Sequence, residues 1–241
     1  VILVQNIGVF CIGDNLKAAK VAADLTETNA RVISSVEETS KYKFISKKDI
    51  FDVEYWSLEQ AKIKKEIKEL AGHVVVITGA FGKIGTATYK LFKKYGAEVV
   101  LIDNNRKKVT EMSKKIDDLC IYCDVTNKES VKKAFNLISS KFGGIDILIS
   151  NAGTALGGPI AEVDDKILRK SFEDNFFSHQ NCAAEATKIM KVQNIEGCLL
   201  FNISKQSVNP GKNFGPYGLP KSALLNLCKQ YALDYGAYGI R

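Results

Sequence analysis

HVVVITGAFGKIG, residues 73–85, is the stretch that decides the fold. Its opening residues are mostly β-branched and apolar, the composition of a buried strand. Glycines then follow at positions 79, 82 and 85, where the strand would turn into a helix. Such a turn needs residues without a Cβ, so that the backbone can approach a pyrophosphate at the positive end of the helix. A glycine pattern alone is weak evidence, but a strand before it and a helix after it predict a dinucleotide site.

The same alternation of strand and helix continues along the chain. Short apolar runs predict further strands at 97–103, 119–125, 146–153 and 197–204. The segments between and after them predict helices at 83–96, 105–116, 129–142, 165–190 and 217–235. Near-continuous apolar strands between helices predict a parallel sheet covered on both faces, which is a doubly wound α/β fold of the Rossmann type.

Residues 1–71 have a different pattern and form a mostly helical extension. Two short apolar runs come first, and Asn15 then provides an N-cap for a helix to about Glu38. A second helix is predicted in the segment DVEYWSLEQAKIKKEIKEL, residues 52–70. We therefore predict two domains, 1–71 and 72–241. The chain starts with Val1 and stops at Arg241 directly after a helical pattern, so we expect a fragment that lacks the last strands of its sheet.

The composition is that of an ordinary globular protein, with 46% apolar and 25% charged residues. The net charge is +7, but the lysines are spread along helical segments without interleaved aromatic residues. We therefore expect no nucleic-acid partner, although a mildly positive field suits an anionic ligand. The apolar run at the start is short and lacks a basic lead. The sequence thus predicts no membrane partner and a cytoplasmic location.

The six cysteines and two histidines of the sequence do not suggest a metal site. Cys120 and Cys123 form a single CxxC within a predicted strand, where an odd spacing sends two side chains to opposite faces. Zinc and redox centres of this type need a second pair or a different context. We expect free thiols in a reducing compartment and no bound metal.

Polar residues at the ends of the later predicted strands favour a ligand site at one edge of the sheet. Asp103 comes 18 residues after Gly85, where a carboxylate can accept hydrogen bonds from both ribose hydroxyls and repel a 2′-phosphate. This favours NAD over NADP; the alternative is an aspartate that caps the next helix, and Arg106 weakens the preference. Asp124-Val125 and Asn151-Ala152-Gly153 close the next two strands.

Tyr217 and Lys221 lie four residues apart in a predicted helix and would share one face of it, with Ser204 thirteen residues upstream. A cation beside a phenol stabilises the phenolate, which makes a tyrosine a usable general acid/base. Taken alone, this pair is also compatible with an ordinary solvated helix. The pair becomes evidence for catalysis because a nucleotide-type turn lies upstream of it.

In their order and spacing, these motifs resemble those of the short-chain dehydrogenase/reductase family over residues 72–241. Lys83 is the one departure, because many members have glycine there. The resemblance implies that Tyr217 is the general acid/base, that Lys221 tunes it and holds the nicotinamide ribose, that Ser204 orients the substrate oxygen, and that Asn175 positions a water. The residues expected to bind the cofactor are Thr78, Gly79, Gly82, Lys83, Ile84, Gly85, Asp103, Asp124, Val125, Asn151, Ala152, Gly153, Tyr217 and Lys221.

Residues 1–71 are similar to the joining region of bifunctional proteins that carry a class II aldolase before a short-chain dehydrogenase. The segments FDVEYWSLEQAK, residues 51–62, and KELAG, residues 68–72, carry this second resemblance. Those proteins are described as rhamnulose-1-phosphate aldolase/L-lactaldehyde dehydrogenases. The resemblance implies carbohydrate metabolism and a small hydroxy-aldehyde, alcohol or sugar as substrate. The metal-binding histidines of such an aldolase would lie before residue 1, so we expect no aldolase activity from this chain.

Two alternatives remain open at this point: a sugar-alcohol-phosphate dehydrogenase, and an NAD-binding module without catalytic activity. We expect residues 155–159 and 209–214 to border the substrate pocket. The resemblance also implies a homo-oligomer whose interface uses the 165–190 helix and the Tyr217 helix. Three aromatic residues fit a helix buried on two sides: Phe172, Phe176 and Phe177.

Overall fold

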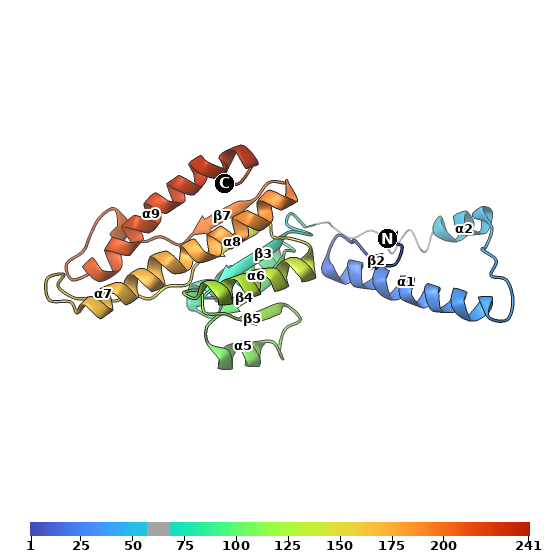
Figure 1. Cartoon of the computed structure of the whole chain (residues 1–241), viewed down its shortest axis with the longest axis horizontal. Helices are drawn as coiled ribbons and strands as arrows, with labels where there is room; N and C mark the ends of the chain where they lie inside the picture. Colours follow the sequence, from blue (N-terminus) through green and yellow to red (C-terminus); the bar gives the residue numbers. More distant parts are fainter. Residues whose placement is uncertain (57–67) are drawn as a thin grey trace. The chain divides into compact units, whose positions relative to one another are not determined.

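The computed structural model describes residues 1–56 and 68–241 of the chain (Figure 1). The described residues form two compact units, Val1–Gly72 and His73–Arg241. In the described part of the chain, no helix combines the length and the apolar character that a membrane crossing requires. Each unit is described by itself below.

The described residues of the N-terminal unit form a hairpin and two helices. Strands β1 (Ile2–Val4) and β2 (Gly8–Phe10) pair antiparallel, and the helices are α1 (Leu16–Glu37) and α2 (Lys47–Glu54). The predicted cap is confirmed, because the Asn15 side chain accepts a hydrogen bond of 2.9 Å from the N–H of Ala18. Neither helix has a fully buried residue. Of the helix predicted at 52–70, the first residues belong to α2 and most of the rest lies outside the described residues.

The C-terminal unit contains a five-stranded parallel sheet in the order β5-β4-β3-β6-β7, which confirms the predicted doubly wound fold. The chain runs outward through the first three strands and then crosses back to place β6 on the other side of β3. Such a reversal opens a crevice at the carboxyl ends of the two central strands. The strands are β3 (Val74–Thr78), β4 (Glu98–Asp103), β5 (Leu119–Tyr122), β6 (Ile147–Ser150) and β7 (Cys198–Phe201).

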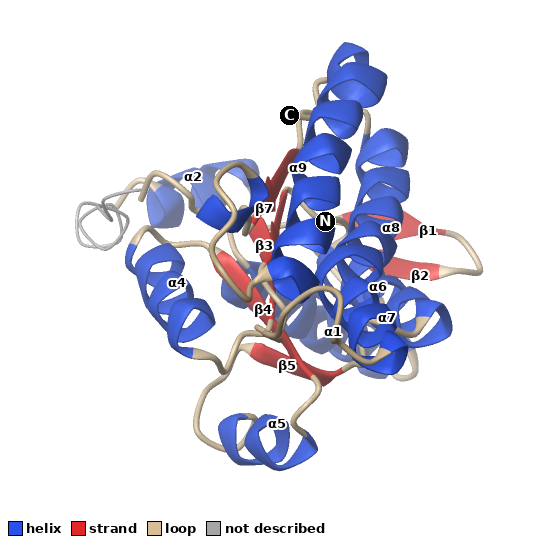
Figure 2. Cartoon of the chain, turned by 90° about the vertical axis from the view of Figure 1, so that its left-hand side faces the viewer, coloured by secondary structure: helices blue, strands red, loops and turns tan. Residues whose placement is uncertain are grey.

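Helices cover both faces of this sheet, as Figure 2 shows, with α4 on one side and α6 and α8 on the other. The α-helices of this unit are α4 (Lys83–Lys94), α5 (Arg106–Met112), α6 (Lys128–Phe142), α7 (Asp165–Phe172), α8 (Ser178–Gln193) and α9 (Gly215–Tyr235). Short turns of other helix types are η1 (Glu173–Phe177), η2 (Lys205–Ser207) and η3 (Gly236–Tyr238).

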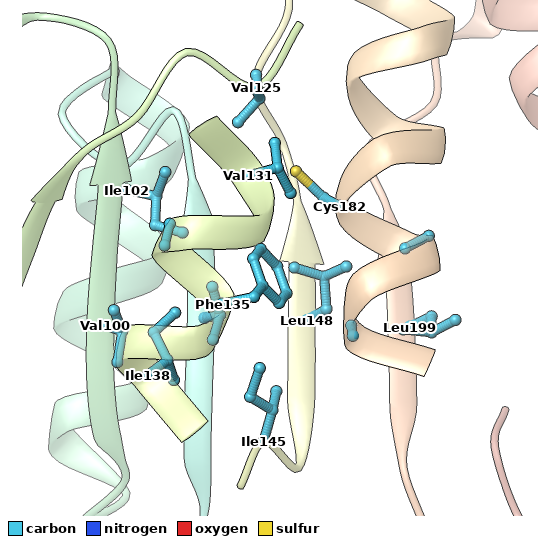
Figure 3. Packing of buried hydrophobic residues seen from close by; sticks show 14 of the residues in the cluster. Val100, Ile102, Val125, Val131, Phe135, Ile138, Ile145, Leu148, Cys182 and Leu199 are labelled. Carbon is cyan, nitrogen blue, oxygen red and sulfur yellow. The ribbon is translucent and has the colours of Figure 1, made fainter. Parts of the chain in front are cut away.

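The core lies between the sheet and helices α6 and α8 (Figure 3). Phe135 and Ile138 of α6 are fully buried there, together with Leu148 of β6 and Cys182 of α8. Burial of one such aliphatic or aromatic side chain contributes about 1.5–3 kcal/mol. Packing of this kind fixes β6 and α8, the two elements that carry a buried part of the site described below.

The single helix predicted over 165–190 is wrong in one respect, because a π-helical turn, η1, separates α7 from α8. In this turn the N–H of Ser178 bonds to the carbonyl of Glu173, five residues earlier. A π turn inserts one extra residue per turn and occurs frequently at functional sites. Asn175, at its centre, is fully buried. Of the three phenylalanines, Phe172 and Phe176 are half-buried and Phe177 is exposed in the single chain.

Three predicted strands end earlier in the structure, which moves several site residues into loops. Strand β6 ends at Ser150, so Asn151, Ala152 and Gly153 follow it. Strand β5 ends at Tyr122, so the opposite-face argument for Cys120 and Cys123 does not hold, since Cys123 follows the strand. Strand β7 ends at Phe201, so Ser204 also follows its strand. All six cysteines are free thiols.

Candidate active site

A cavity of about 810 Å³ opens at the carboxyl ends of the parallel strands. Its size is within the range of small-molecule and cofactor sites. The structure brings together thirteen of the sixteen predicted site residues in its lining: Gly79, Gly82, Lys83, Ile84, Asp103, Asp124, Val125, Asn151, Ala152, Gly153, Asn175, Tyr217 and Lys221. The three that do not line it are Thr78, Gly85 and Ser204.

The glycine turn between β3 and α4 forms one wall of this cavity. Gly79 has a positive φ of 61°, and a Cβ there would lie 3.0 Å from the Cα of Ala152. A Cβ on Gly85 would lie 2.4 Å from the carbonyl oxygen of Gly79, so this glycine serves close packing of α4 on the turn. Gly82 is the N-cap residue of α4 and provides no side-chain hydrogen bond. The first N–H groups of α4 are therefore available to a phosphate, and the turn fits the pyrophosphate of a dinucleotide.

Thr78 and Asn151 hold the two central strands together at the cavity floor. The hydroxyl of Thr78 accepts hydrogen bonds from the N–H groups of Asn151, at 2.9 Å, and Ala152, at 3.1 Å. The Asn151 amide donates to the Thr78 carbonyl at 3.0 Å and accepts from the side chain of Asn202 at 2.8 Å. Thr78 thus supports the cavity from behind, and Asn151 connects the ends of β3, β6 and β7.

Asp103 lines the cavity beyond the glycine turn and is held in place by the backbone. Its carboxylate accepts hydrogen bonds from the N–H groups of Phe81, at 3.0 Å, and Asn105, at 2.9 Å. The helix that follows is capped by Asn105 and not by Asp103, since the Asn105 side chain accepts from the N–H of Lys108. Asp124 lies nearby, where its carboxylate accepts from the N–H and hydroxyl of Thr126.

Besides Lys83, a second cation lines this end of the cavity: Lys108, which the sequence did not single out. Its ammonium lies 3.4 Å from the carbonyl oxygen of Phe81, and the residue lines the cavity. Arg106, which the sequence suggested as a cation near Asp103, stacks its guanidinium over the ring of Tyr122 at 4.3 Å. It is not part of the cavity lining. A positive charge is therefore available near Asp103, but from a different residue than expected.

Asn175 reaches the cavity wall from the π turn. Its side chain forms two hydrogen bonds with the backbone of Thr154: the amide nitrogen donates to the carbonyl at 2.8 Å, and the oxygen accepts from the N–H at 3.2 Å. A Cβ on Gly153 would lie 2.7 Å from the Asn175 oxygen and 3.6 Å from the Lys221 nitrogen. Glycine at position 153 therefore leaves room for the Asn175 oxygen, whereas Lys221 would be in ordinary van der Waals contact with a Cβ there.

Lys221 is buried at the base of the cavity, with Tyr217 one turn earlier on α9. The ammonium donates to the carbonyl of Asn202 at 2.9 Å and lies 5.9 Å from the centre of the Tyr217 ring. This distance is within the range in which an ammonium and an aromatic ring attract each other. Burial lowers the pKa of Lys221 to about 8.

His179 is the site residue that sequence reasoning missed. Its Nε2 lies 3.2 Å from the ammonium of Lys221, and its Nδ1 lies 2.7 Å from the hydroxyl of Ser150. Burial, with a smaller contribution from the charge of Lys221, lowers the pKa of His179 to about 3. One signal was available in the sequence, because residue 179 follows Asn175 by four positions and so shares its helix face. From the sequence, the histidines were informative only about a metal site.

Ser204 does not reach the cavity lining in this structure. Its hydroxyl accepts a hydrogen bond of 3.2 Å from the N–H of Gln206 and caps η2. Its role toward a substrate stays a prediction. Of the two loops expected to border the pocket, only Ala155 is in the lining. The loops do lie side by side, since the N–H of Gly158 donates to the carbonyl of Asn213 at 2.7 Å.

Comparison with known families identifies the C-terminal unit. Residues 73–241 match the family described as short chain dehydrogenase. The chain belongs to this family. Members of the short-chain dehydrogenase family are oxidoreductases that use nicotinamide cofactors and small-molecule substrates. Residues 1–63 match the second domain of class II aldolases, over a smaller part of the chain.

Individual relatives of this short-chain dehydrogenase are oxidoreductases by name. The "Uncharacterized oxidoreductase YuxG" of Bacillus subtilis (strain 168) is 31% identical over all of this chain and 36% of its own length. "Short chain aldehyde dehydrogenase 1" of Euphorbia lathyris is 35% identical over 72% of this chain and 62% of its own. The chain thus spans about a third of the length of YuxG and less than two thirds of the length of the Euphorbia enzyme. The solved structure "NAD+-Bound Xylitol Dehydrogenase" is 28% identical, with a TM-score of 0.67 over 73% of this chain and 69% of that one.

Substitution of Gly153 tests the close approach at the cavity floor. We expect Gly153→Ala to lower the free energy of unfolding by about 1–3 kcal/mol, because the new methyl group would overlap the Asn175 oxygen. Urea titration followed by circular dichroism measures the change. Gly236→Ala is the matched control, since a Cβ at that position meets nothing within 4 Å. Equal stability of the two variants would contradict the packing described for Gly153.

Proposed function

We propose that this protein is an NAD-linked oxidoreductase that transfers a hydride between the cofactor and a small hydroxy-aldehyde, alcohol or sugar. The observation that carries the proposal is the convergence of Tyr217 and Lys221 with the glycine turn on one cavity. Membership in the short-chain dehydrogenase family supports it, as do the names of relatives that act on aldehydes and on xylitol.

In this mechanism Tyr217 exchanges a proton with the substrate oxygen as general acid/base. Lys221 stabilises the phenolate form through its nearby positive charge. Its ammonium uses two of its three N–H groups on Asn202 and His179, which leaves one for the side of the cavity. When bound, the nicotinamide supplies the hydride acceptor or donor. An aldehyde would react as its hydrate, whose hydroxyl offers Tyr217 a proton in the same way as an alcohol does.

The choice of NAD over NADP is proposed from Asp103. Two backbone N–H groups hold its carboxylate at the far end of the cavity, where a ribose would lie. A fixed negative charge there disfavours a 2′-phosphate through like-charge repulsion. Lys108 and Lys83 line the same end and would soften this discrimination.

Replacing the carboxylate should change the cofactor preference. We expect Asp103→Ser to raise the ratio of kcat/KM for NADP to that for NAD by at least about tenfold, which corresponds to about 1.4 kcal/mol of removed repulsion. Steady-state kinetics with both cofactors measures the ratio. In the control, Lys108→Gln should shift the ratio in the opposite direction, because it removes a cation. A ratio unaffected by Asp103→Ser would contradict the assignment.

The N-terminal unit suggests the metabolic setting. We propose that residues 1–71 form the tail of a class II aldolase-type domain and its connector, and residues 72–241 the dehydrogenase. Support comes from the aldolase match over residues 1–63 and from the similarity to YuxG, which spans the whole chain. A bifunctional aldolase/dehydrogenase would use a small hydroxy-aldehyde or its sugar precursor. A sugar-alcohol phosphate is the second substrate class, favoured by Lys170 of α7, which lines the cavity.

One observation favours a different function, an NAD-binding module without turnover. Ser204, which would orient the substrate oxygen, caps η2 and is not in the cavity lining. A dehydrogenase needs this oxygen to be held close to the tyrosine hydroxyl. Turnover measurements therefore decide between the two functions.

Tyr217→Phe separates catalysis from cofactor binding. We expect kcat to fall about 10²- to 10⁴-fold, because the variant lacks the proton that general acid/base catalysis requires, while NAD binds as before. Absorbance of NADH reports turnover on hydroxy-aldehydes, polyols and their phosphates, and calorimetry reports NAD binding. Tyr238→Phe is the matched control, since Tyr238 is exposed and outside the cavity. NAD binding without turnover on any of these substrates would support the silent module and refute the enzyme.

We also propose a homo-oligomer that uses the helical segment 165–193 and helix α9. Five large apolar side chains on these elements are exposed in the single chain: Ile167, Phe177, Val192, Leu219 and Leu233. Burial of such side chains between subunits would contribute to assembly.

Light scattering tests the assembly. We expect a mass that is a multiple of the chain mass of 26.5 kDa. Phe177→Glu should shift this mass toward that of the single chain, because a charge would be buried in the interface. Leu137→Glu, on α6, is the control, since Leu137 is exposed to a similar degree. A monomeric mass for the unaltered protein would contradict the proposal.

A further inference from the structure

A line of three polar side chains runs from the cavity into the protein interior. Lys221 of α9, His179 of α8 and Ser150 of β6 are each at most 3% exposed. The His179 ring lies between the other two, 3.2 Å from the Lys221 ammonium and 2.7 Å from the Ser150 hydroxyl. These contacts join three elements that are far apart in the sequence.

The protonation state of this line follows from hydrogen-bond chemistry. The imidazole is neutral, because burial and the neighbouring ammonium both lower the pKa of His179. A neutral imidazole has one donor and one acceptor nitrogen, whereas an ammonium only donates. Nε2 of His179 therefore accepts from Lys221, and the Nδ1–H donates to Ser150.

This arrangement serves Lys221 and not a proton path to solvent. Ser150 is 1% exposed at the end of a central strand, so the line ends inside the protein. A proton relay to solvent would need an exit, and a general base would need a pKa nearer to neutrality. What the imidazole does provide is an acceptor that favours the charged form of a buried lysine.

We propose that His179 is a positioning residue that holds the Lys221 ammonium in its charged form and directs its third N–H toward the cavity. His179 would act on the reaction through Lys221. The effect on turnover rests on the proposed function, but the effect on the lysine itself does not.

No other described group can replace the imidazole directly. The hydrogen-bond partners of Lys221 in the described part of the chain are Asn202 and His179, and neither is a carboxylate. Tyr217 faces the ammonium from its own helix. Asp124, Lys170 and Asp174 line the same cavity, from the loop after β5, from α7 and from η1. Asn175 and Ser150 are uncharged. Loss of the imidazole acceptor should therefore destabilise the ammonium.

Two near-isosteric variants separate the two contacts of the ring. In His179→Gln the side-chain oxygen can reach the place of Nε2 and accept from Lys221, while the bond to Ser150 is lost. In His179→Asn the amide nitrogen can take the place of Nδ1 and donate to Ser150, while the bond to Lys221 is lost. His179→Leu removes both contacts.

Nuclear magnetic resonance of the lysine and histidine side chains tests the proposal without substrate. The sequence has two histidines, so His73→Gln assigns the imidazole signals. In the unaltered protein we expect His179 to stay neutral, with its proton on Nδ1, and its Nε2 signal to move as Lys221 titrates near its pKa of about 8. His179→Asn and His179→Leu should lower the midpoint of Lys221 by about one pH unit, and His179→Gln should restore it.

The pH dependence of turnover gives the second readout. If charged Lys221 is the active form, kcat/KM is lost as the pH rises through the pKa of this lysine. The alkaline limb should therefore move to lower pH in His179→Asn and His179→Leu, by the same amount as the midpoint, and stay in place in His179→Gln.

Three results would overturn the proposal: a His179 that titrates near its ordinary value, a proton found on its Nε2, or equal Lys221 midpoints in the Gln and Asn variants. Absence of turnover with the expected lysine midpoints would instead refute the proposed function and leave the role of His179 intact. The two failures are thus distinguishable.

Discussion

A buried ammonium at the carboxyl ends of the strands is the constraint on which the site depends. A cation removed from water is costly unless its N–H groups find acceptors. Lys221 finds them in the carbonyl of Asn202, just after β7, and in His179 of α8. The lysine of α9 can be buried at the cavity because both acceptors lie within hydrogen-bond distance of its ammonium. The ammonium of Lys221 therefore connects the end of β7, helix α8 and the first turns of α9.

The other contacts at this edge of the sheet keep that geometry rigid. Thr78, Asn151 and Asn202 form a hydrogen-bonded line across the ends of β3, β6 and β7. Gly153 leaves room for the approach of Asn175, and the π turn brings Asn175 to the backbone of Thr154. Because these groups bond mainly to one another, the cavity is organised by the protein alone. A preorganised site of this kind spends little binding energy on ordering itself.

The sequence predicted what local patterns determine, and missed what packing determines. The parallel sheet and most cavity residues followed from apolar strands and from polar residues at their ends, because such ends meet at one edge. The π turn carries no local sequence signal, and the contact that its Asn175 makes is with Thr154, 21 residues away in the chain. The role of His179 depends on its contacts with Ser150 and Lys221, which lie 29 and 42 residues away in the chain. The helix caps differ in the same way: Asn15 was predicted as a cap, whereas the helix after β4 is capped by Asn105, for which the sequence offered Asp103 only as an alternative.

The nature of the acceptor at Lys221 has a consequence for the chemistry of the cavity. A carboxylate in the position of His179 would also satisfy the ammonium, and would hold its charge more strongly. It would, however, cancel most of the positive field at Tyr217, whose ring lies 5.9 Å from the same ammonium. A neutral imidazole fills the hydrogen-bonding requirement and leaves the charge uncompensated. The full cation would then be available to the phenolate proposed for Tyr217, although burial lowers the pKa of Lys221 and so disfavours its charged form.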